Sequence, residues 1–164
     1  MSKNFLWAPW RMDYITSSNK GKNIFIEKAN STDDRENLVL YRGEKSFVLM
    51  NLYPYNNGHL MIAPYKVYND LSDLDSETFI EITKLTQSSI IILKNTLNHQ
   101  GINFGLNMGE AAGAGIKDHL HFHIVPRWVG DSNFMPIVGH TNVVMQGLYN
   151  TYDLLKPEFD SLNK

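Results

Sequence analysis

One stretch of the chain alternates histidine with apolar residues: His119-Leu120-His121-Phe122-His123-Ile124-Val125. Side chains of a β-strand point alternately to opposite faces, so the three histidines would share one face at intervals of about 6.5 to 7 Å. The apolar residues between them would share the other face, where we expect Phe122 to be buried against a helix. The stretch therefore predicts a strand, residues 120–125, that is anchored by its apolar face and presents three imidazoles on the opposite face.

The segments around this strand predict an α+β fold. Apolar runs separated by turn residues predict further strands at residues 37–41, 46–52, 59–64 and 102–106. Helical spacing of apolar residues predicts a long helix that begins at Asp75 or Ser76 and ends near His99-Gln100-Gly101, where glycine suits a C-terminal cap. We expect Pro126 to end the histidine strand, and a last helix over residues 143–155 to be broken by Pro157. The fold predicted is a mostly antiparallel sheet with one long helix packed on a face and a C-terminal helix.

The bulk properties of the chain limit its class and its partners. A length of 164 residues predicts a single domain, residues 1–164, in which an irregular N-terminal arm (1–36) packs through its aromatic residues onto a core (37–164). The net charge of −2 gives no general attraction for nucleic acid or an anionic membrane, so a polyanionic substrate needs a local site. The chain has 0 cysteines, which excludes disulfides and thiolate metal ligands, and it shows no signal-peptide pattern. We expect a cytoplasmic protein.

The aligned histidines are open to three interpretations. They could be solvated residues without a function, or a His-x-His metal site, since imidazole is a common zinc ligand. The third interpretation is phosphate chemistry. Imidazole titrates near pH 6.5, so one ring can be a neutral nucleophile while neighbouring rings donate hydrogen bonds to phosphate oxygens.

Two neighbouring segments favour phosphate chemistry. Residues 107–116 contain three glycines and three alanines and end three residues before His119. Small residues allow backbone N–H groups to approach an anion closely, so this loop is a candidate phosphate cradle. The second segment is the turn Asn56-Asn57-Gly58, which places His59, a fourth histidine, at the start of another expected strand.

The histidine stretch resembles the motif of the histidine-triad (HIT) superfamily. Further similarity to this superfamily covers most of the chain and lies in residues 7–12, 51–59, 113–116, 126–128 and 133–136. It points to the bacterial branch near the diadenosine-tetraphosphate phosphorylases and the fragile-histidine-triad hydrolases. The resemblance implies an α+β fold of antiparallel strands with a helix, usually as a homodimer.

The same resemblance implies a role for each site residue. His121 would be the nucleophile that forms a nucleotidyl-histidine, and His119 and His123 would bind and polarise the phosphate or orient the nucleophile. His59 would contribute near the phosphates. The remaining expected contacts are Asn51 at the ribose, and Asn107, Gly113, Ala114, Gly115 and Ile116 near the phosphates.

These expectations define one main function and two alternatives. The main function is cleavage of adenine nucleotides or dinucleoside polyphosphates through His121, with water or inorganic phosphate as the acceptor. It requires no cofactor, although Mg²⁺ can arrive with the polyphosphate, and it involves neither nucleic acid nor a membrane. The alternatives are a non-catalytic nucleotide-binding module and a metal-dependent hydrolase with a His-x-His site.

The chain departs from the family at a metal site. Many relatives in that branch carry Cys-x-x-Cys near the N-terminus and a histidine after the third strand, which bind a structural zinc together with the first triad histidine. The corresponding residues here are Asn23, Ile26 and Val67. Because three ligands are missing, we do not expect a structural zinc, and we expect packing of residues 24–26 to hold this region instead.

Overall fold

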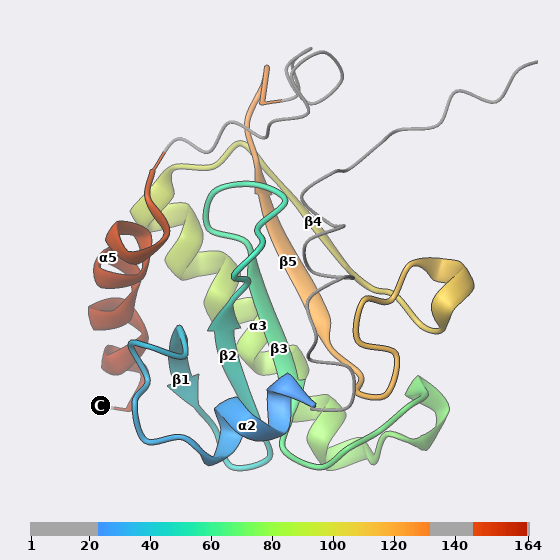
Figure 1. Cartoon of the computed structure of the whole chain (residues 1–164). Helices are drawn as coiled ribbons and strands as arrows, with labels where there is room; N and C mark the ends of the chain where they lie inside the picture. Colours follow the sequence, from blue (N-terminus) through green and yellow to red (C-terminus); the bar gives the residue numbers. More distant parts are fainter. Residues whose placement is uncertain (1–22, 132–145, 164) are drawn as a thin grey trace, which may run out of the picture.

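The structure, a computed structural model, describes residues 23–131 and 146–163. Its helices are α2 (Ile24–Asn30), α3 (Ser76–Leu97) and α5 (Leu148–Asp160), and its strands are β1 (Val39–Arg42), β2 (Ser46–Met50), β3 (Leu60–Pro64), β4 (Gly101–Leu106) and β5 (Phe122–Arg127) (Figure 1). Short 3-10 turns span Leu71–Asp73, Glu110–Ala112 and Ser161–Asn163. The aromatic residues of the expected arm, Trp7 and Trp10, and the family-like residues 133–136 lie outside the described residues.

The strands form one sheet in the order β1-β2-β3-β5-β4, and every neighbouring pair is antiparallel. The long helix α3 connects β3 to β4, as the sequence predicted, and α5 follows the sheet. The α+β prediction is therefore confirmed. None of the described helices is both long and apolar enough to cross a membrane.

The two faces of the sheet are covered differently. On one face, alternate strand residues pack against α3 and α5 in the larger core; its strand members include Val48, Met50, Leu60, Ile62, Phe122 and Ile124. Phe122 is 3% exposed, which confirms that this face of the histidine stretch is buried. On the other face, α2 covers β1, β2 and β3 through a smaller core of Phe25, Val39, Phe47, Leu49, Met61 and Ala63. The histidines lie on this second face, because His123 pairs with Met61.

Helix α2 corrects the expectation of an irregular segment before residue 37. Its N-cap is Asn23, whose side-chain oxygen accepts from the amides of Phe25 (3.1 Å) and Ile26 (3.3 Å). At the other end, the guanidinium of Arg42 donates to backbone carbonyls at the end of the helix, including that of Ala29 (2.8 Å). A helix of 7 residues is too short to show a clear apolar period, so packing and capping must stabilise it.

Two predictions about proline were wrong. Pro126 does not end β5, which runs from Phe122 to Arg127 instead of 120–125. Beyond Ile124, β5 pairs only with β4, so one side of the strand has no partner at Pro126. A strand tolerates proline where its missing N–H has no neighbouring strand to bind. Pro157 lies inside α5, which ends only at Asp160. Its missing N–H would have donated to the carbonyl of Asp153, so the helix loses one hydrogen bond and continues to Asp160.

The predicted start of the long helix is confirmed, whereas its C-terminal cap differs from the expectation. The side chain of Asp75 accepts from the amide of Thr78 (2.9 Å) and forms the N-cap of α3. At the other end the left-handed residue is Asn98 (φ 48°), not Gly101, which is the first residue of β4. Asparagine tolerates this conformation better than most residues and substitutes for the expected glycine.

Candidate active site

Three histidines come together on the open face of the sheet. His123 is on β5 and lies between the rings of His121 and His59, with centroid distances of 4.9 and 5.1 Å. The turn at residues 56–58 places His59 just before β3, and Gly58 adopts φ +71°, where an added Cβ would lie 2.5 Å from a methyl group of Leu97. The predicted meeting of His59 with the histidines of the triad is present in the structure.

The partners of His59 fix the direction of its hydrogen bonds. Its Nδ1 accepts from the backbone N–H of Tyr55 (3.0 Å), with the amide nitrogen of Asn51 at 3.4 Å. Its proton must then be on Nε2, which lies 2.9 Å from Nδ1 of His123 and donates to it. Burial lowers the pKa of His59 to about 3, so the ring is neutral. His123 accepts at Nδ1, and in its neutral form it therefore carries its own proton on Nε2.

His121 is held in the tautomer that a nucleophile needs. Its Nδ1 donates to the backbone carbonyl of His119 at 2.8 Å, which leaves the lone pair on Nε2. The side chain is buried, and burial lowers the pKa of His121 below its ordinary value. A neutral imidazole with a free Nε2 lone pair can attack an electrophilic phosphorus.

His119 lies on the same side of the sheet as the other two histidines, as expected, because the ring of Phe25 contacts the rings of both His119 and His121 while Leu120 packs into the larger core with Phe122. β5 begins only at Phe122, so His119 precedes the paired strand. The ring is 1% exposed, with Nε2 at 2.8 Å from the carbonyl oxygen of Pro64 and Nδ1 at 3.2 Å from Oδ1 of Asn23. His119 therefore acts on the site through its backbone carbonyl, not by a ring directed at substrate.

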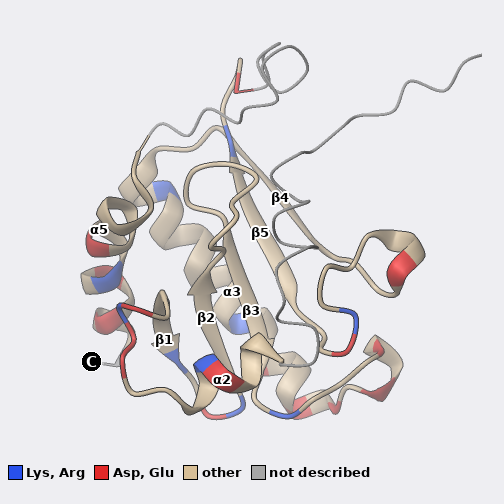
Figure 2. Ribbon diagram, in the orientation of Figure 1, with Lys and Arg blue, Asp and Glu red and all other residues tan. Residues whose placement is uncertain are grey.

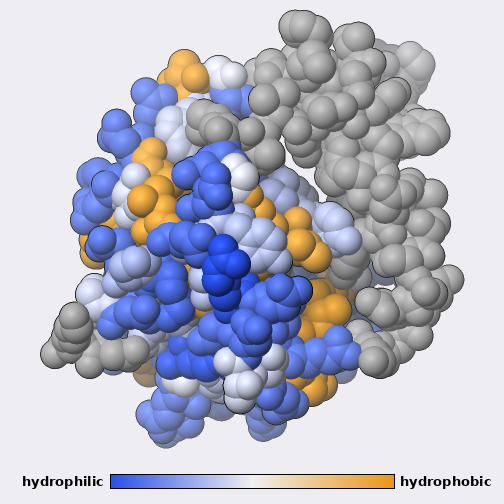
Figure 3. All heavy atoms as spheres, turned by 60° about the vertical axis from the view of Figure 1, so that its left-hand side comes forward, coloured by the Kyte–Doolittle hydropathy of each residue, from blue (hydrophilic) through white to orange (hydrophobic). Residues whose placement is uncertain are grey.

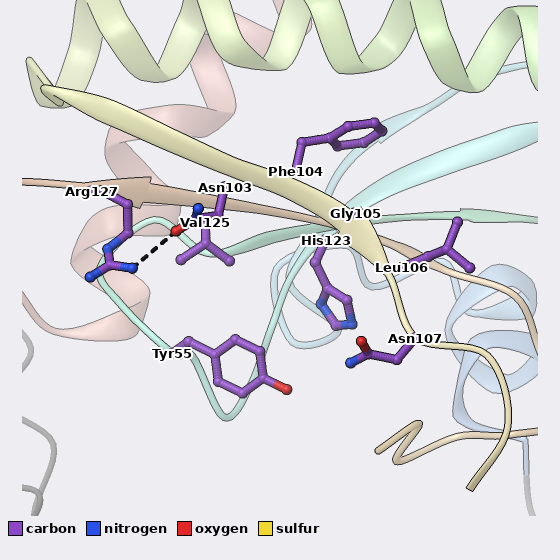
Figure 4. A pocket seen from close by; sticks show the side chains of 9 residues that line it. All are labelled: Tyr55, Asn103, Phe104, Gly105, Leu106, Asn107, His123, Val125 and Arg127. Carbon is purple, nitrogen blue, oxygen red and sulfur yellow. Dashed lines mark hydrogen bonds between the residues drawn. The ribbon is translucent and has the colours of Figure 1, made fainter. Parts of the chain in front are cut away.

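A pocket with a volume of about 290 Å³ opens beside His123 between β5, β4 and the loop before β3. Side chains that reach it include Tyr55, Asn103, Asn107, His123, Val125 and Arg127. Figure 4 shows Tyr55, His123 and Asn107 converging from three segments, whereas Phe104 points toward the opposite side of the sheet. The volume of this pocket is near the lower end of the range of volumes found for sites that bind small molecules.

Register explains why these residues meet. Gly105 of β4 pairs with His123, and Asn103 pairs with Val125, so alternate residues of both strands face the pocket. Because Gly105 has no side chain, the space beside His123 stays open, and an added Cβ would contact nothing within 4 Å. At the far end, Arg127 donates to Asn103 (2.9 Å) and pairs with Asp131 (2.6 Å).

The expected nucleotide-contacting residues are placed in different ways. Asn107 lines the pocket with His123, whereas Asn51 lies next to His59 and its side-chain oxygen accepts from the amide of Tyr53 (3.0 Å). In the glycine-rich loop, Gly113 and Ala114 donate to the carbonyls of Glu110 (3.0 Å) and Gly109 (3.2 Å). Of the four expected residues, therefore, Gly115 and Ile116 are the better candidates for free phosphate-binding amides. Ile116 also packs against the core that contains Phe25, whose ring lies 4.9 Å from that of His121.

The sequence interpretation missed several pocket residues. Val125 and Arg127 follow His123 at a spacing of two, so the strand period alone could have found them. Asn103 and Gly105 required the pairing register of β4 with β5, which the sequence does not give. Tyr55 is in the family-like segment 51–59, but neither strand nor helix period singles it out from its neighbours in this loop.

The residues at the family's zinc positions do not fit a zinc ion. Asn23 caps α2, and Ile26 and Val67 are partly exposed apolar side chains, so His119 is the one possible ligand. Both nitrogens of that ring already face oxygen atoms. Elsewhere in residues 23–131 and 146–163, no group of three or more His, Asp or Glu side chains is placed to hold a metal.

Comparison with known proteins identifies the family. The family model of the HIT domain matches residues 32–129, which is more than half of the chain. The chain therefore belongs to the HIT domain family, and its histidine stretch leads into β5.

Named relatives and solved structures agree with this assignment. The chain is 40% identical over 163 residues to the AP-4-A phosphorylase of Mycobacterium tuberculosis, covering 94% of this chain and 83% of that protein. It is 31% identical over 93 residues to the bis(5'-adenosyl)-triphosphatase of Dictyostelium discoideum, covering 57% and 62% of the two chains. A hypothetical histidine triad nucleotide-binding protein of Sulfolobus tokodaii shares the fold with a TM-score of 0.67 and 24% identity, covering 86% and 94%.

Proposed function

We propose that this chain cleaves adenine dinucleoside polyphosphates by transferring a nucleotidyl group to His121. The observation that carries this proposal is the hydrogen bond from Nδ1 of His121 to the carbonyl of His119 (2.8 Å), which leaves Nε2 free as a nucleophile. The neighbouring imidazoles supply a matched donor, because His59 directs the proton of neutral His123 to Nε2.

The first step forms a bond between Nε2 of His121 and the α-phosphorus. The bond from that phosphorus to the bridging oxygen breaks, and the distal nucleotide departs with the electron pair. The Nε2–H of His123 donates to the departing oxygen as its charge develops. Asn107 and the amides of the glycine-rich loop replace the hydration that the phosphates lose when they enter the site.

In the second step an acceptor attacks the nucleotidyl-histidine and releases His121. We propose inorganic phosphate as this acceptor, which is supported by 40% identity over 94% of the chain to a protein named as a phosphorylase. Diadenosine tetraphosphate and phosphate would then give ATP in the first step and ADP in the second.

One assay separates this proposal from its alternatives. Purified protein is incubated with diadenosine tetraphosphate, with and without inorganic phosphate, and the products are separated. ADP that forms only with phosphate supports phosphorolysis, whereas ATP and AMP without phosphate indicate hydrolysis through the same intermediate. Binding without cleavage would indicate a nucleotide-binding module. Loss of activity on removal of bound metal, not restored by Mg²⁺, would indicate a metal-dependent hydrolase.

We also propose that this protein holds no structural zinc, because Asn23, Ile26 and Val67 offer no zinc ligand. Elemental analysis of purified, dialysed protein should give far less than one zinc per chain. A stoichiometric zinc ion whose removal unfolds the protein would contradict this.

A homodimer through β4 is the proposed assembly. The β1 edge of the sheet is covered by α5, whose Tyr152 hydroxyl donates to the carbonyl of Val39 (3.0 Å), and the surface on this side is mainly hydrophilic (Figure 3). At the other edge, the middle of β4 is exposed, and Phe104 is 52% exposed beside the 45% exposed Phe79. An exposed strand edge with apolar side chains is a template for pairing with a second copy.

Sedimentation analysis tests this assembly. We expect the wild-type protein to be a dimer and Phe104→Lys to be largely monomeric, because a charge at the edge strand opposes pairing. Leu154→Lys is the matched control, since this side chain is 44% exposed on α5, which lies next to β1 at the opposite edge of the sheet. A monomeric wild-type protein would overturn the proposed assembly.

A further inference from the structure

The first turn of α2 contacts the triad although none of its residues is a histidine. The ring of Phe25 is 0% exposed and lies 5.1 Å from the ring of His119 and 4.9 Å from that of His121. Residue 23, just before the helix, approaches His119 by its side chain. The triad is therefore supported from outside the sheet by one short helix.

The side-chain oxygen of Asn23 has two kinds of partner. It accepts from the amides of Phe25 (3.1 Å) and Ile26 (3.3 Å), and it also lies 3.2 Å from Nδ1 of His119. The two amides identify this atom as the oxygen, since an NH₂ group could not accept from them. One atom thus joins the start of α2 to His119.

His119 transmits this contact to the nucleophile. Its ring nitrogens face two acceptors, Oδ1 of Asn23 (3.2 Å) and the carbonyl of Pro64 (2.8 Å), and donate to both when the ring carries two protons. Its backbone carbonyl accepts a hydrogen bond from Nδ1 of His121 (2.8 Å). A shift of His119 would move the acceptor that fixes the tautomer of His121. A shift of Phe25 would remove the ring that packs against His121.

The far end of α2 is fixed independently. Arg42 donates to the carbonyls of Lys28 (3.0 Å), Ala29 (2.8 Å) and Ser31 (2.7 Å) and pairs with Asp34 (2.8 Å). The helix is therefore anchored to β1 at its C-terminal end, and the contact at residue 23 determines where its first turn lies against the triad.

We propose that Asn23 is a positioning residue for His121. It caps α2 and holds His119, so that Nε2 of His121 faces the substrate phosphorus, and it touches no substrate itself. The inference rests on the proposed function, since Asn23 positions the nucleophile of that reaction. A small misplacement of a reacting atom can lower the rate about a hundredfold, so the effect should be large enough to measure.

Three substitutions separate capping from positioning. Asn23→Ser keeps a cap for α2, but its shorter side chain does not reach His119; we expect kcat to fall at least tenfold, KM to change less than threefold and the melting temperature to stay near wild type. Asn23→Asp keeps an oxygen in both roles and should restore most of kcat. Asn23→Ala removes both roles and should lower kcat and the melting temperature together.

Asp75→Ala is the matched control, because it removes the N-cap of α3 without touching a histidine. It should lower the melting temperature with kcat within twofold of wild type. The positioning role is overturned if Asn23→Ser retains kcat within twofold of wild type, or if Asp75→Ala loses as much kcat as Asn23→Ala.

A spectroscopic measurement distinguishes failure of this inference from failure of the proposed function. The ¹⁵N shifts of the His121 ring report which nitrogen carries the proton. In the wild-type protein we expect the proton on Nδ1, and in Asn23→Ser a mixture of the two tautomers. If the wild type cleaves no dinucleoside polyphosphate, the proposed function fails, and an unchanged His121 tautomer in Asn23→Ser would still refute the positioning role.

Discussion

Each of the four clustered histidines has its own partners, and these partners decide what its ring can do. His59 is buried and accepts from a backbone amide, so it stays neutral and orients His123. His121 donates a hydrogen bond from Nδ1 to a carbonyl and keeps a lone pair on Nε2. His119 contributes that carbonyl. Four identical side chains thereby provide one nucleophile, one donor and two supports.

His121→Asn tests the nucleophile. Asparagine can still donate to the carbonyl of His119, but it lacks a nucleophilic ring nitrogen, so turnover should fall by several orders of magnitude while nucleotide binding and the melting temperature are retained. Steady-state kinetics and equilibrium binding of diadenosine tetraphosphate check this outcome. In addition, wild-type protein quenched in alkali should carry a nucleotide label on His121, because a phosphoramidate survives base better than acid.

His99→Asn is a suitable control, since this histidine follows α3 and has no contact with the triad, and it should leave turnover unchanged. Near-wild-type turnover by His121→Asn with normal nucleotide binding would mean that another group makes the attack.

At the residue scale, the sequence predicted the meeting of His59, His121 and His123 and the side of the sheet on which His119 lies. It did not predict that the ring of His119 is buried between Asn23 and the carbonyl of Pro64, because these contacts join distant parts of the chain. The contact of Asn23 with His119 joins residues 96 positions apart, so no local pattern could reveal it.

At the scale of elements, β4 shapes the pocket through a glycine, because this residue puts no side chain next to His123. Gly105 pairs with His123, and a side chain at this position would project into the space beside the imidazole. Figure 4 shows the strand passing directly next to His123 without a side chain there. A glycine inside a strand weakens it, so its presence here is explained by the space that it leaves for a ligand.

Gly105→Val should separate stability from function. Valine favours a strand, so the free energy of unfolding should stay the same or rise by up to about 1 kcal/mol. Its side chain narrows the pocket, so kcat/KM for diadenosine tetraphosphate should fall at least tenfold. Chemical denaturation and steady-state kinetics measure the two effects. Gly101→Val, at the start of the same strand, is the control, and equal activity of both variants would show that substrate does not pass Gly105.

The elements found from sequence are those with strong periods. α3 has 22 residues and a clear apolar face, and β2 and β3 lie between turn residues, so their positions were predicted within a few residues. α2 was missed because its 7 residues show no clear apolar period, and the helix depends on the packing of Phe25 and on the contacts of Asn23 and Arg42 at its ends. The order β1-β2-β3-β5-β4 depends on long-range pairing that the strand patterns do not specify.

At the scale of the whole molecule, the sheet separates stability from chemistry. α3 and α5 bury one face, and α2 buries half of the other; none of the described helices covers the β5–β4 half, where the pocket lies (Figure 1). In Figure 2 the charged residues of the described segments are scattered over helices and loops. Substrate phosphates must therefore be held by hydrogen bonds in the site, because the Lys and Arg residues of the described segments do not gather in one place.

The histidines that serve the chemistry also make the fold sensitive to acid. Burial lowers the pKa of His59 to about 3, and it lowers the pKa of His121 in the same direction. In the unfolded chain a histidine binds a proton near pH 6.5, so between pH 6.5 and about 3 the unfolded state binds more protons than the native state. The stabilisation from neutral His59 is thus complete above pH 6.5 and is lost as the pH falls.

The size of this loss can be measured with one substitution. A shift from 6.5 to about 3 corresponds to at most about 5 kcal/mol, at about 1.4 kcal/mol per pKa unit. His59→Asn keeps an acceptor near the amide of Tyr55 but cannot titrate, so its free energy of unfolding should fall less steeply with pH than that of the wild type. Denaturation curves between pH 7 and 4 give both slopes, and the carboxylates, common to both proteins, cancel in the difference. Parallel slopes would show that His59 takes up a proton as readily in the native state as in the unfolded chain, which would remove the basis for a neutral His59 that orients His123.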